Sequence, residues 1–203
     1  GSEFSKSATA DGIFHAPDGD VTHEFMHETM ESTYYAADNF AAVGKYLEGS
    51  GSMWFLLPDE GVTPEELLSD GGAVDFLLSP ETVESKYMII DLSVPKFDVS
   101  ADTDLAGALH TLGVTDVFDA DTADFSPLTD DSDGIFLSQA KHAARVTIDE
   151  EGVVAAAYTV MAAAGAAMPP DERVEFTLDR PFLFAVTGAS GEILFAGIVN
   201  TPV

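Results

Sequence analysis

The sequence predicts an α+β fold, made mostly of β-strands with a few short helices. Apolar runs of strand length recur along the 203 residues, and helix signals fall in short stretches grouped between blocks of strands. This grouping is typical of α+β domains, whereas regular strand–helix alternation would indicate βαβ units. Because 46% of the residues are hydrophobic, the chain can bury a core.

A loop followed by strands is expected in the first part of the chain. Residues 5–20 are polar and rich in Gly, Pro and Asp, which favours a loop. Strands are expected at 32–36, 40–47 and 53–57, separated by turn residues. The last of these runs is apolar throughout, as in a strand that is buried on both faces.

Two short helices are expected next. Thr63 is a good N-cap, Pro64 suits the first turn, and Glu65 and Glu66 lie near the positive end of the helix dipole. A second short helix is expected over residues 74–78.

The clearest helix signal covers residues 100–113. Leucines recur there at helical spacing, Ser100 or Asp102 can cap the first turn, and Gly113 ends the pattern. Residues 114–134 are rich in loop-forming side chains.

The remaining strands lie on either side of that helix. Residues 87–99 are rich in β-formers, with Pro95 indicating an edge or a bulge. Residues 137–148 are predicted to form one long strand. Residues 176–199 are predicted to form two apolar strands around a turn at 188–191.

The charge balance restricts the partners of the chain. With 36 acidic and 8 basic residues, the net charge is -28. Nucleic acid is disfavoured because its phosphates require Lys and Arg, and anionic membranes are disfavoured for the same reason. We interpret the charge as a solvated acidic surface suited to high salt, with an acidic recognition patch as the alternative. No apolar run is long enough for a membrane-spanning helix.

The motif H-E-F-M-H at residues 23–27 matches the H-E-x-x-H signature of zinc peptidases. That chemistry needs a helix, so that both His rings reach one metal ion. Residues 21–28 instead alternate as in a strand, which would separate the two His residues by about 13 Å. We therefore expect a strand here and no zinc site.

Other routes to catalysis also lack support in the sequence. There is no Cys, so disulfides, thiolate catalysis and Cys-type zinc sites are excluded. No Gly-x-Ser-x-Gly elbow is present. The acidic turn at 131–134 resembles a calcium loop only weakly, because Ala140 stands where a bidentate Glu is needed. We expect no enzyme activity, no catalytic residue, no metal and no cofactor.

Small residues dominate from Gly152 to Ala167. Alanine favours a helix, whereas the interspersed Val, Thr and Tyr side chains favour a strand. The segment is therefore ambivalent between an exposed loop and an inserted strand.

Several blocks of sequence, in order and in register, resemble the serpin family. They are FLLPDEG at 55–61, VPKF at 94–97, ADFS at 123–126, FTLDRPFLFAV at 176–186 and ILFAGIVNTP at 193–202. The resemblance runs from about Gly12 to Pro202 and matches the C-terminal half of a serpin. It implies the serpin fold: mostly antiparallel sheets, a few helices and an exposed reactive-centre loop at about 150–170.

The resemblance also implies the organisation of the chain and its function. Residues 1–203 would be the C-terminal part of a single serpin domain, and the absent N-terminal half is an expected partner. The implied activity is suicide inhibition of a serine protease by a metastable fold, in an extracellular or cell-surface location. The alternative is a non-inhibitory serpin derivative or an inactive fragment.

By the same resemblance, the reactive bond joins Ala166 and Ala167, within a window of similar sites at 162–168. A small residue before the bond suits elastase-like or subtilisin-like proteases. The loop hinge would consist of Gly152, Val153, Val154, Ala155, Ala156 and Ala157. None of these is charged, as insertion into a sheet requires, because a buried unpaired charge is costly.

Three further residues take roles from the resemblance. Glu150 and Lys96 match the ion pair of the breach, the top of the large sheet where the loop enters. His142 matches the buried His of the shutter, the mid-sheet region that parts during insertion.

Overall fold

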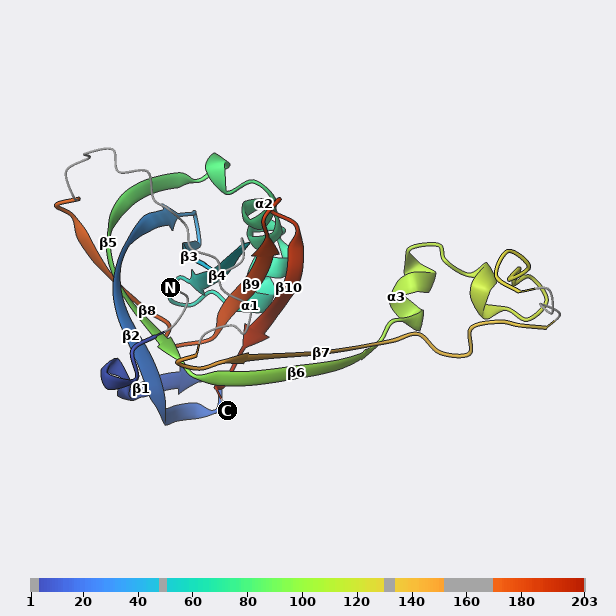
Figure 1. Cartoon of the computed structure of the whole chain (residues 1–203), viewed down its shortest axis with the longest axis horizontal. Coiled ribbons are helices and arrows are strands. Elements are labelled where there is room, and N and C mark those ends of the chain that lie inside the picture. Colours follow the sequence, from blue (N-terminus) through green and yellow to red (C-terminus); the bar gives the residue numbers. More distant parts are fainter. Residues whose placement is uncertain (1–3, 48–50, 130–133, 152–169, 203) are drawn as a thin grey trace. The chain divides into compact units, whose positions relative to one another are not determined.

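The computed structural model describes residues 4–47, 51–129, 134–151 and 170–202 (Figure 1). Two compact units are present, residues 1–98 with 147–203, and residues 99–146. The strands are β1 (Ala10–Ala16), β2 (Gly19–Ala36), β3 (Phe40–Tyr46), β4 (Gly51–Pro58), β5 (Glu84–Pro95), β6 (Phe97–Asp104), β7 (Lys141–Ile148), β8 (Arg173–Thr177), β9 (Phe182–Gly188) and β10 (Ile193–Val199). The helices are α1 (Pro64–Ser69), α2 (Gly72–Leu78) and α3 (Ala106–Thr111), with 3-10 turns η1 (Lys6–Ala8), η2 (Pro80–Thr82) and η3 (Asp116–Phe118).

An eight-stranded sheet organises the first unit. Its order is β10-β9-β4-β3-β2-β5-β8, and β1 pairs with β2. All pairs are antiparallel except β5 with β8, which are parallel. A second sheet contains only β6 and β7 among the described residues. This strand-rich arrangement with few helices confirms the α+β prediction.

The first helix begins where the sequence predicts. Thr63 and Glu66 form a reciprocal capping box: the Thr63 backbone N–H donates to Glu66 Oε2 at 2.8 Å, and the Glu66 backbone N–H donates to Thr63 Oγ1 at 3.2 Å. Hydrogen bonds donated to the Glu66 carboxylate by the backbone N–H and by the hydroxyl of Thr63 lower the pKa of this carboxyl. Helix α2 includes the predicted residues 74–78.

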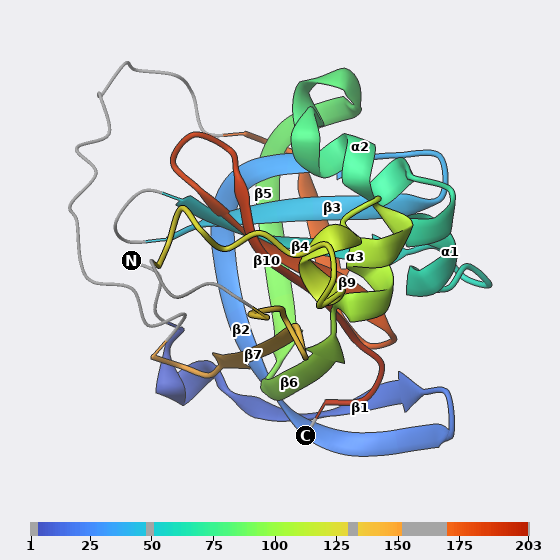
Figure 2. The same ribbon diagram turned by 90° about the vertical axis from the view of Figure 1, so that its right-hand side faces the viewer.

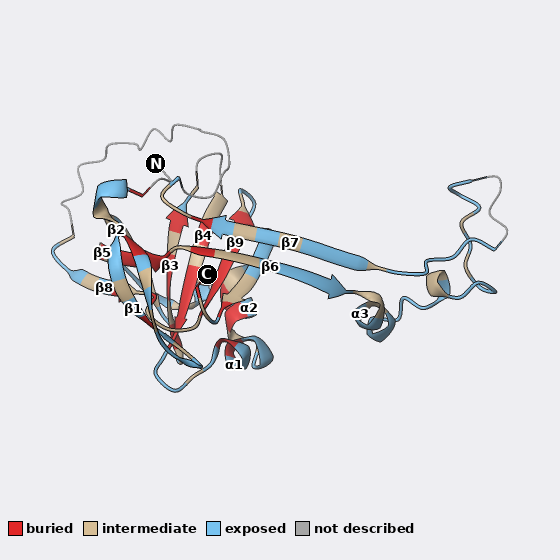
Figure 3. Ribbon diagram, turned by 90° about the horizontal axis from the view of Figure 1, so that it is seen from below, coloured by how far each residue is buried: buried red, intermediate tan, exposed pale blue. Residues whose placement is uncertain are grey.

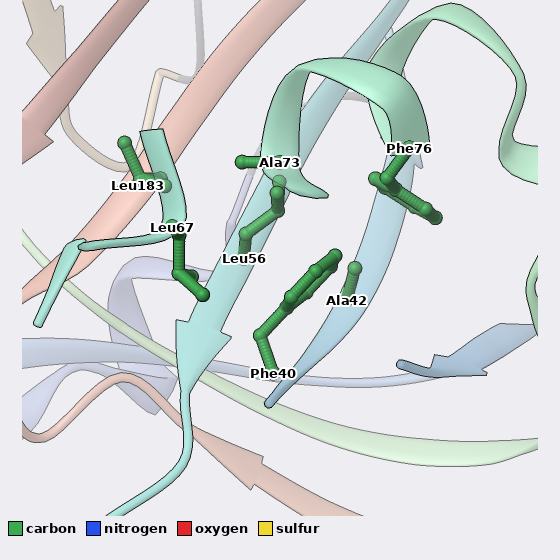
Figure 4. Close-up of a cluster of buried hydrophobic side chains, with 7 residues drawn as sticks. All are labelled: Phe40, Ala42, Leu56, Leu67, Ala73, Phe76 and Leu183. Carbon is green, nitrogen blue, oxygen red and sulfur yellow. The ribbon is translucent and has the colours of Figure 1, made fainter. Parts of the chain in front are cut away.

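Helices α1 and α2 cover one face of the sheet at β3, β4 and β9 (Figures 2 and 4). The buried cluster there consists of Phe40, Ala42, Leu56, Leu67, Ala73, Phe76 and Leu183. Ala42 pairs with Leu56, and Leu56 pairs with Leu183, so the three side chains share this face.

Aromatic rings fill the opposite face of the same strands. Phe55 pairs with Phe184, and each is adjacent in sequence to a residue of that cluster, Leu56 or Leu183, so both point away from the helices. Phe97 packs against Phe182 and Phe184 with ring centroids 5.8 and 5.2 Å apart. Phe14 meets Phe182 edge-on at 6.5 Å. Strand β4 is therefore buried on both faces, as its continuous apolar run predicts.

The loop predicted for residues 5–20 is wrong, because β1 forms a hairpin with β2 there. Ala10 to Ala16 pair with Phe25 to Gly19, and Phe14 is fully buried. Gly19 adopts φ 123 just after the turn, a backbone conformation that favours glycine. The segment was predicted as a loop because it is polar, and it is polar because most residues of β1 are exposed to solvent.

The helix predicted for residues 100–113 is shorter than expected. Residues up to Asp104 belong to β6, and the Asp104 carboxylate, rather than Ser100 or Asp102, accepts the N–H of Ala106 at 3.0 Å. Pairing with β7 satisfies backbone groups of this stretch, so the sheet outweighs the local helix signal. Gly113, at φ 86, follows the helix end as predicted.

Two other strand boundaries also differ from the prediction. The strand predicted over 137–148 begins at Lys141. The region predicted as two strands over 176–199 contains parts of three. Strands β9 and β10 lie on either side of the predicted turn, and the first residues of the region belong to β8, which starts at Arg173 and ends at Thr177. Pro181 separates β8 from β9, since proline has no N–H to donate to a ladder.

Candidate functional site

The candidate site consists of the two ends of the predicted bait segment. The predicted reactive bond, Ala166–Ala167, and the hinge, Gly152 to Ala157, lie outside the described residues. The residues on either side are described, from β7 to Glu151 and from Pro170 into β8. Their contacts define how the segment is attached to the fold.

Glu150 is the centre of the upstream attachment. Lys96 Nζ lies 2.8 Å from Glu150 Oε1, and Thr9 Oγ1 donates to the same oxygen at 2.9 Å. The backbone N–H of Phe4 donates to the Glu150 carbonyl at 2.9 Å. Only 14% of the Glu150 side chain is exposed. The structure thus brings together the two residues that the resemblance assigns to the breach.

The charges of this pair stabilise each other. Hydrogen bonding from the Lys96 ammonium, helped by backbone and Thr9 donors, lowers the pKa of Glu150 to about 2. Glu150, followed by Glu24, raises the pKa of Lys96. Both groups therefore stay charged near neutral pH. Their role in sheet opening stays a prediction.

The zinc-like motif lies on β2, which confirms that it is extended. His23 Nε2 lies 2.8 Å from the carbonyl oxygen of Lys96, and His27 Nδ1 lies 2.8 Å from Ser93 Oγ. The two rings thus contact different partners, His27 on strand β5 and His23 just after its end. Within the described ranges, no group of three or more His, Cys, Asp or Glu residues could hold a metal ion.

Arg173 anchors the downstream end at the start of β8. Its guanidinium makes a two-pronged contact with the Asp91 carboxylate on β5, and Thr29 Oγ1 donates to Asp91 at 2.6 Å. Arg173, followed by Thr29, lowers the pKa of Asp91. The backbone N–H of Ile89 donates to the Glu172 carbonyl at 2.9 Å, which begins the parallel pairing.

Sequence reasoning did not identify Arg173 and Asp91. The sequence did offer one signal for Arg173. Basic residues are scarce, with only 8 in the chain, and Arg173 is the first of them after the bait segment. The partner of Arg173 depended on a parallel pairing that no local pattern indicates.

The expectation that His142 is buried is wrong for this chain, because its side chain is exposed on β7. Figure 3 colours β3, β4 and β9 mostly as buried and β7 mostly as exposed. Among the described residues, β7 pairs only with β6. A role of His142 in the shutter stays a prediction.

Along the described parts of the chain, no helix is both long and apolar enough to cross a membrane.

Comparison with known proteins gives a consistent family. A family model described as Serpin (serine protease inhibitor) matches residues 1–202. Plasminogen activator inhibitor 1 of Neovison vison is 32% identical, over 98% of this chain and 50% of the relative.

Solved structures match in the same way. The thermophilic serpin tengpin in its native state matches with a TM-score of 0.78 and 27% identity, over 98% of this chain and 51% of tengpin. Human thyroxine-binding globulin complexed with thyroxine matches with a TM-score of 0.78 and 27% identity, over 100% of this chain and 53% of the globulin. The chain spans about half the length of the relatives it matches.

Proposed function

This chain belongs to the serpin family, and from that premise we propose that it is the C-terminal part of a suicide inhibitor of serine proteases. The observation that carries the proposal is the family match over residues 1–202, which spans the bait segment and both of its attachments. Glu150 with Lys96 and Arg173 with Asp91 tie the two ends to the fold. A cut between them would leave each half attached at one end only.

The chemistry is that of a substrate that traps its enzyme. The protease serine attacks the Ala166 carbonyl carbon, the bond to Ala167 breaks, and the amine of Ala167 leaves with a proton. The resulting ester links the protease to the segment that follows Glu150. Insertion of this segment as a strand gains ladder hydrogen bonds and apolar burial, so it follows cleavage downhill in free energy.

The residue before the bond selects the class of protease. Alanine fills a shallow pocket, which favours elastase-like and subtilisin-like enzymes, whereas trypsin-like enzymes require Lys or Arg. The test is incubation of the full-length parent with elastase, subtilisin and trypsin. A complex with elastase or subtilisin that survives SDS is expected, and cleavage without any complex would contradict the proposal.

A hinge variant provides the matched test of insertion. Val153→Arg places a charge on the segment that must become a buried strand, at a large cost in desolvation. We expect Val153→Arg to be cleaved as an ordinary substrate with little complex, while Val153→Ala retains complex formation. An unchanged yield of complex in Val153→Arg would reject the insertion mechanism.

A non-inhibitory role is the alternative function. The similarity to thyroxine-binding globulin, solved with thyroxine, favours it as the second candidate. Turnover of the parent by elastase as a simple substrate, with the fold otherwise intact, would support this alternative.

The N-terminal half of the serpin fold is the proposed partner of this chain. Strand β10 is at one end of the sheet order, and its side chains Ile193, Leu194 and Phe195 are 38%, 55% and 44% exposed. Such an apolar edge favours pairing with further strands. Co-refolding with the N-terminal half should protect the β10 amides from hydrogen exchange, and unchanged exchange would contradict this pairing.

We also propose an extracellular or cell-surface location, which fractionation of the source cells would test.

A further inference from the structure

The first two residues of the zinc-like motif hold Lys96. We propose that His23 and Glu24 are positioning residues for Lys96, and that Glu24 keeps Lys96 paired when Glu150 moves. The proposal rests on the proposed function, in which the chain that follows Glu150 changes position. In this proposal, His23 and Glu24 position a lysine instead of binding a metal ion.

The backbone of Lys96 is fixed from both sides by consecutive residues of β2. The N–H of Lys96 donates to the Glu24 carbonyl at 3.0 Å, and His23 Nε2 donates to the Lys96 carbonyl at 2.8 Å. A ring nitrogen facing a carbonyl oxygen must carry the proton. Lys96 lies between the end of β5 and the start of β6, and neither of these two bonds involves Glu150.

The ammonium group has two carboxylate partners at the same time. Nζ lies 2.8 Å from Glu150 Oε1 and 3.0 Å from Glu24 Oε2. An ammonium has three donors, so both bonds form together. Glu24 belongs to β2, and its side chain is 57% exposed. Glu150 precedes the bait segment, and its side chain is only 14% exposed.

This arrangement lowers the cost of releasing Glu150. The Lys96 side chain is only 25% exposed. If Glu150 were its only carboxylate partner, the departure of Glu150 would leave a partly buried charge unpaired. With Glu24 in place, Lys96 exchanges two carboxylates for one and stays paired. Glu24 is therefore expected to set how readily Glu150 leaves.

A double-mutant cycle on the folded chain tests the proposal. Glu24→Gln and Glu150→Gln are made singly and together, and unfolding by urea is followed at neutral pH. We expect the double variant to lose more stability than the two single variants combined, by at least about threefold in the unfolding equilibrium constant. Glu31→Gln removes one charge from the same strand and should show no coupling with Glu150→Gln. Additive losses in the Glu24 cycle would overturn the proposal.

The lysine ammonium signal in NMR gives a second readout, which reports whether Lys96 still has a carboxylate partner. In Glu150→Gln, the Lys96 NH₃⁺ resonance should persist, because Glu24 still protects it from exchange. Its disappearance in this folded single variant would overturn the proposal, even if the double variant does not fold. Neither measurement involves a protease, so failure of inhibition in the parent would not affect them.

Discussion

Glu150 keeps its negative charge well into the acid range because Lys96 holds it. Its pKa is about 2 in the folded chain, against an ordinary value of 4.5. A carboxyl with a lowered folded pKa stabilises the fold above its unfolded pKa, and this stabilisation is lost as the pH falls towards the folded value. The pH window for this residue is therefore from about 4.5 down to about 2.

We expect Lys96→Met to be less stable than the parent chain at neutral pH, with the difference shrinking as the pH falls through that window. Urea unfolding at several pH values measures it. Lys6→Met is the control, because Lys6 and Glu151 are 3.5 Å apart and more than 70% exposed. A difference for Lys96→Met that is independent of pH would contradict this account.

The second prediction at the scale of single residues concerns Thr63, the N-cap of α1. Thr63→Ala removes the side-chain acceptor of the capping box at the start of α1, and should cost about 1 kcal/mol of unfolding free energy. Thr63→Ser retains the hydroxyl and should cost much less. Equal losses in both variants would show that the cap contributes nothing.

At the scale of elements, the Phe76 side chain packs α2 against three aromatic rings of the sheet. Phe76 meets Tyr35, Phe40 and Trp54 edge-on, with ring centroids 5.2 to 5.6 Å apart. Its side chain is only 1% exposed, so truncation would leave a cavity in the packed cluster between the helices and the sheet.

Phe76→Ala should therefore destabilise the chain by about 3–5 kcal/mol. Trp54 is the single tryptophan and a neighbour of the cavity, so its fluorescence reports the unfolding transition in urea. Leu78→Ala, on the same helix but 64% exposed, should cost less than about 0.5 kcal/mol. Similar losses at the two positions would contradict the packing argument.

At the scale of the whole molecule, the surplus negative charge has no internal compensation. The basic residues among the 8 that contact carboxylates within the described fold include Lys6, Lys45, Lys86, Lys96, Arg173 and Arg180. Like charges also face each other across strands, as Asp11 does Glu24, and Asp91 does Glu175. Repulsion among the remaining carboxylates therefore opposes folding.

Salt should stabilise the chain, because the screening length falls from about 10 Å at 0.1 M to about 3 Å at 1 M. We expect Tm to rise by several degrees over this range in calorimetry. Choline chloride should act like sodium chloride if screening is the cause. A Tm that stays constant or falls with salt would contradict the argument.

The sequence by itself determined the fold class, helices α1 and α2, the double burial of β4 and the extended state of the zinc-like motif. These features depend on local signals: apolar spacing, capping residues and the alternation of side chains along a strand. The family also followed from the sequence, because its blocks are contiguous and in register. The pairing of Glu150 with Lys96 followed from that resemblance rather than from any local pattern.

Only the tertiary structure decided features that depend on pairing between distant segments. Strand β1 exists because β2 pairs with it, and residues up to Asp104 are a strand because β7 lies beside them. Lys96 meets His23 and Glu24 across more than 70 residues of sequence. Hydrogen bonds of this kind form between partners that no local window contains, so registry and side-chain exposure were fixed only when the chain folded.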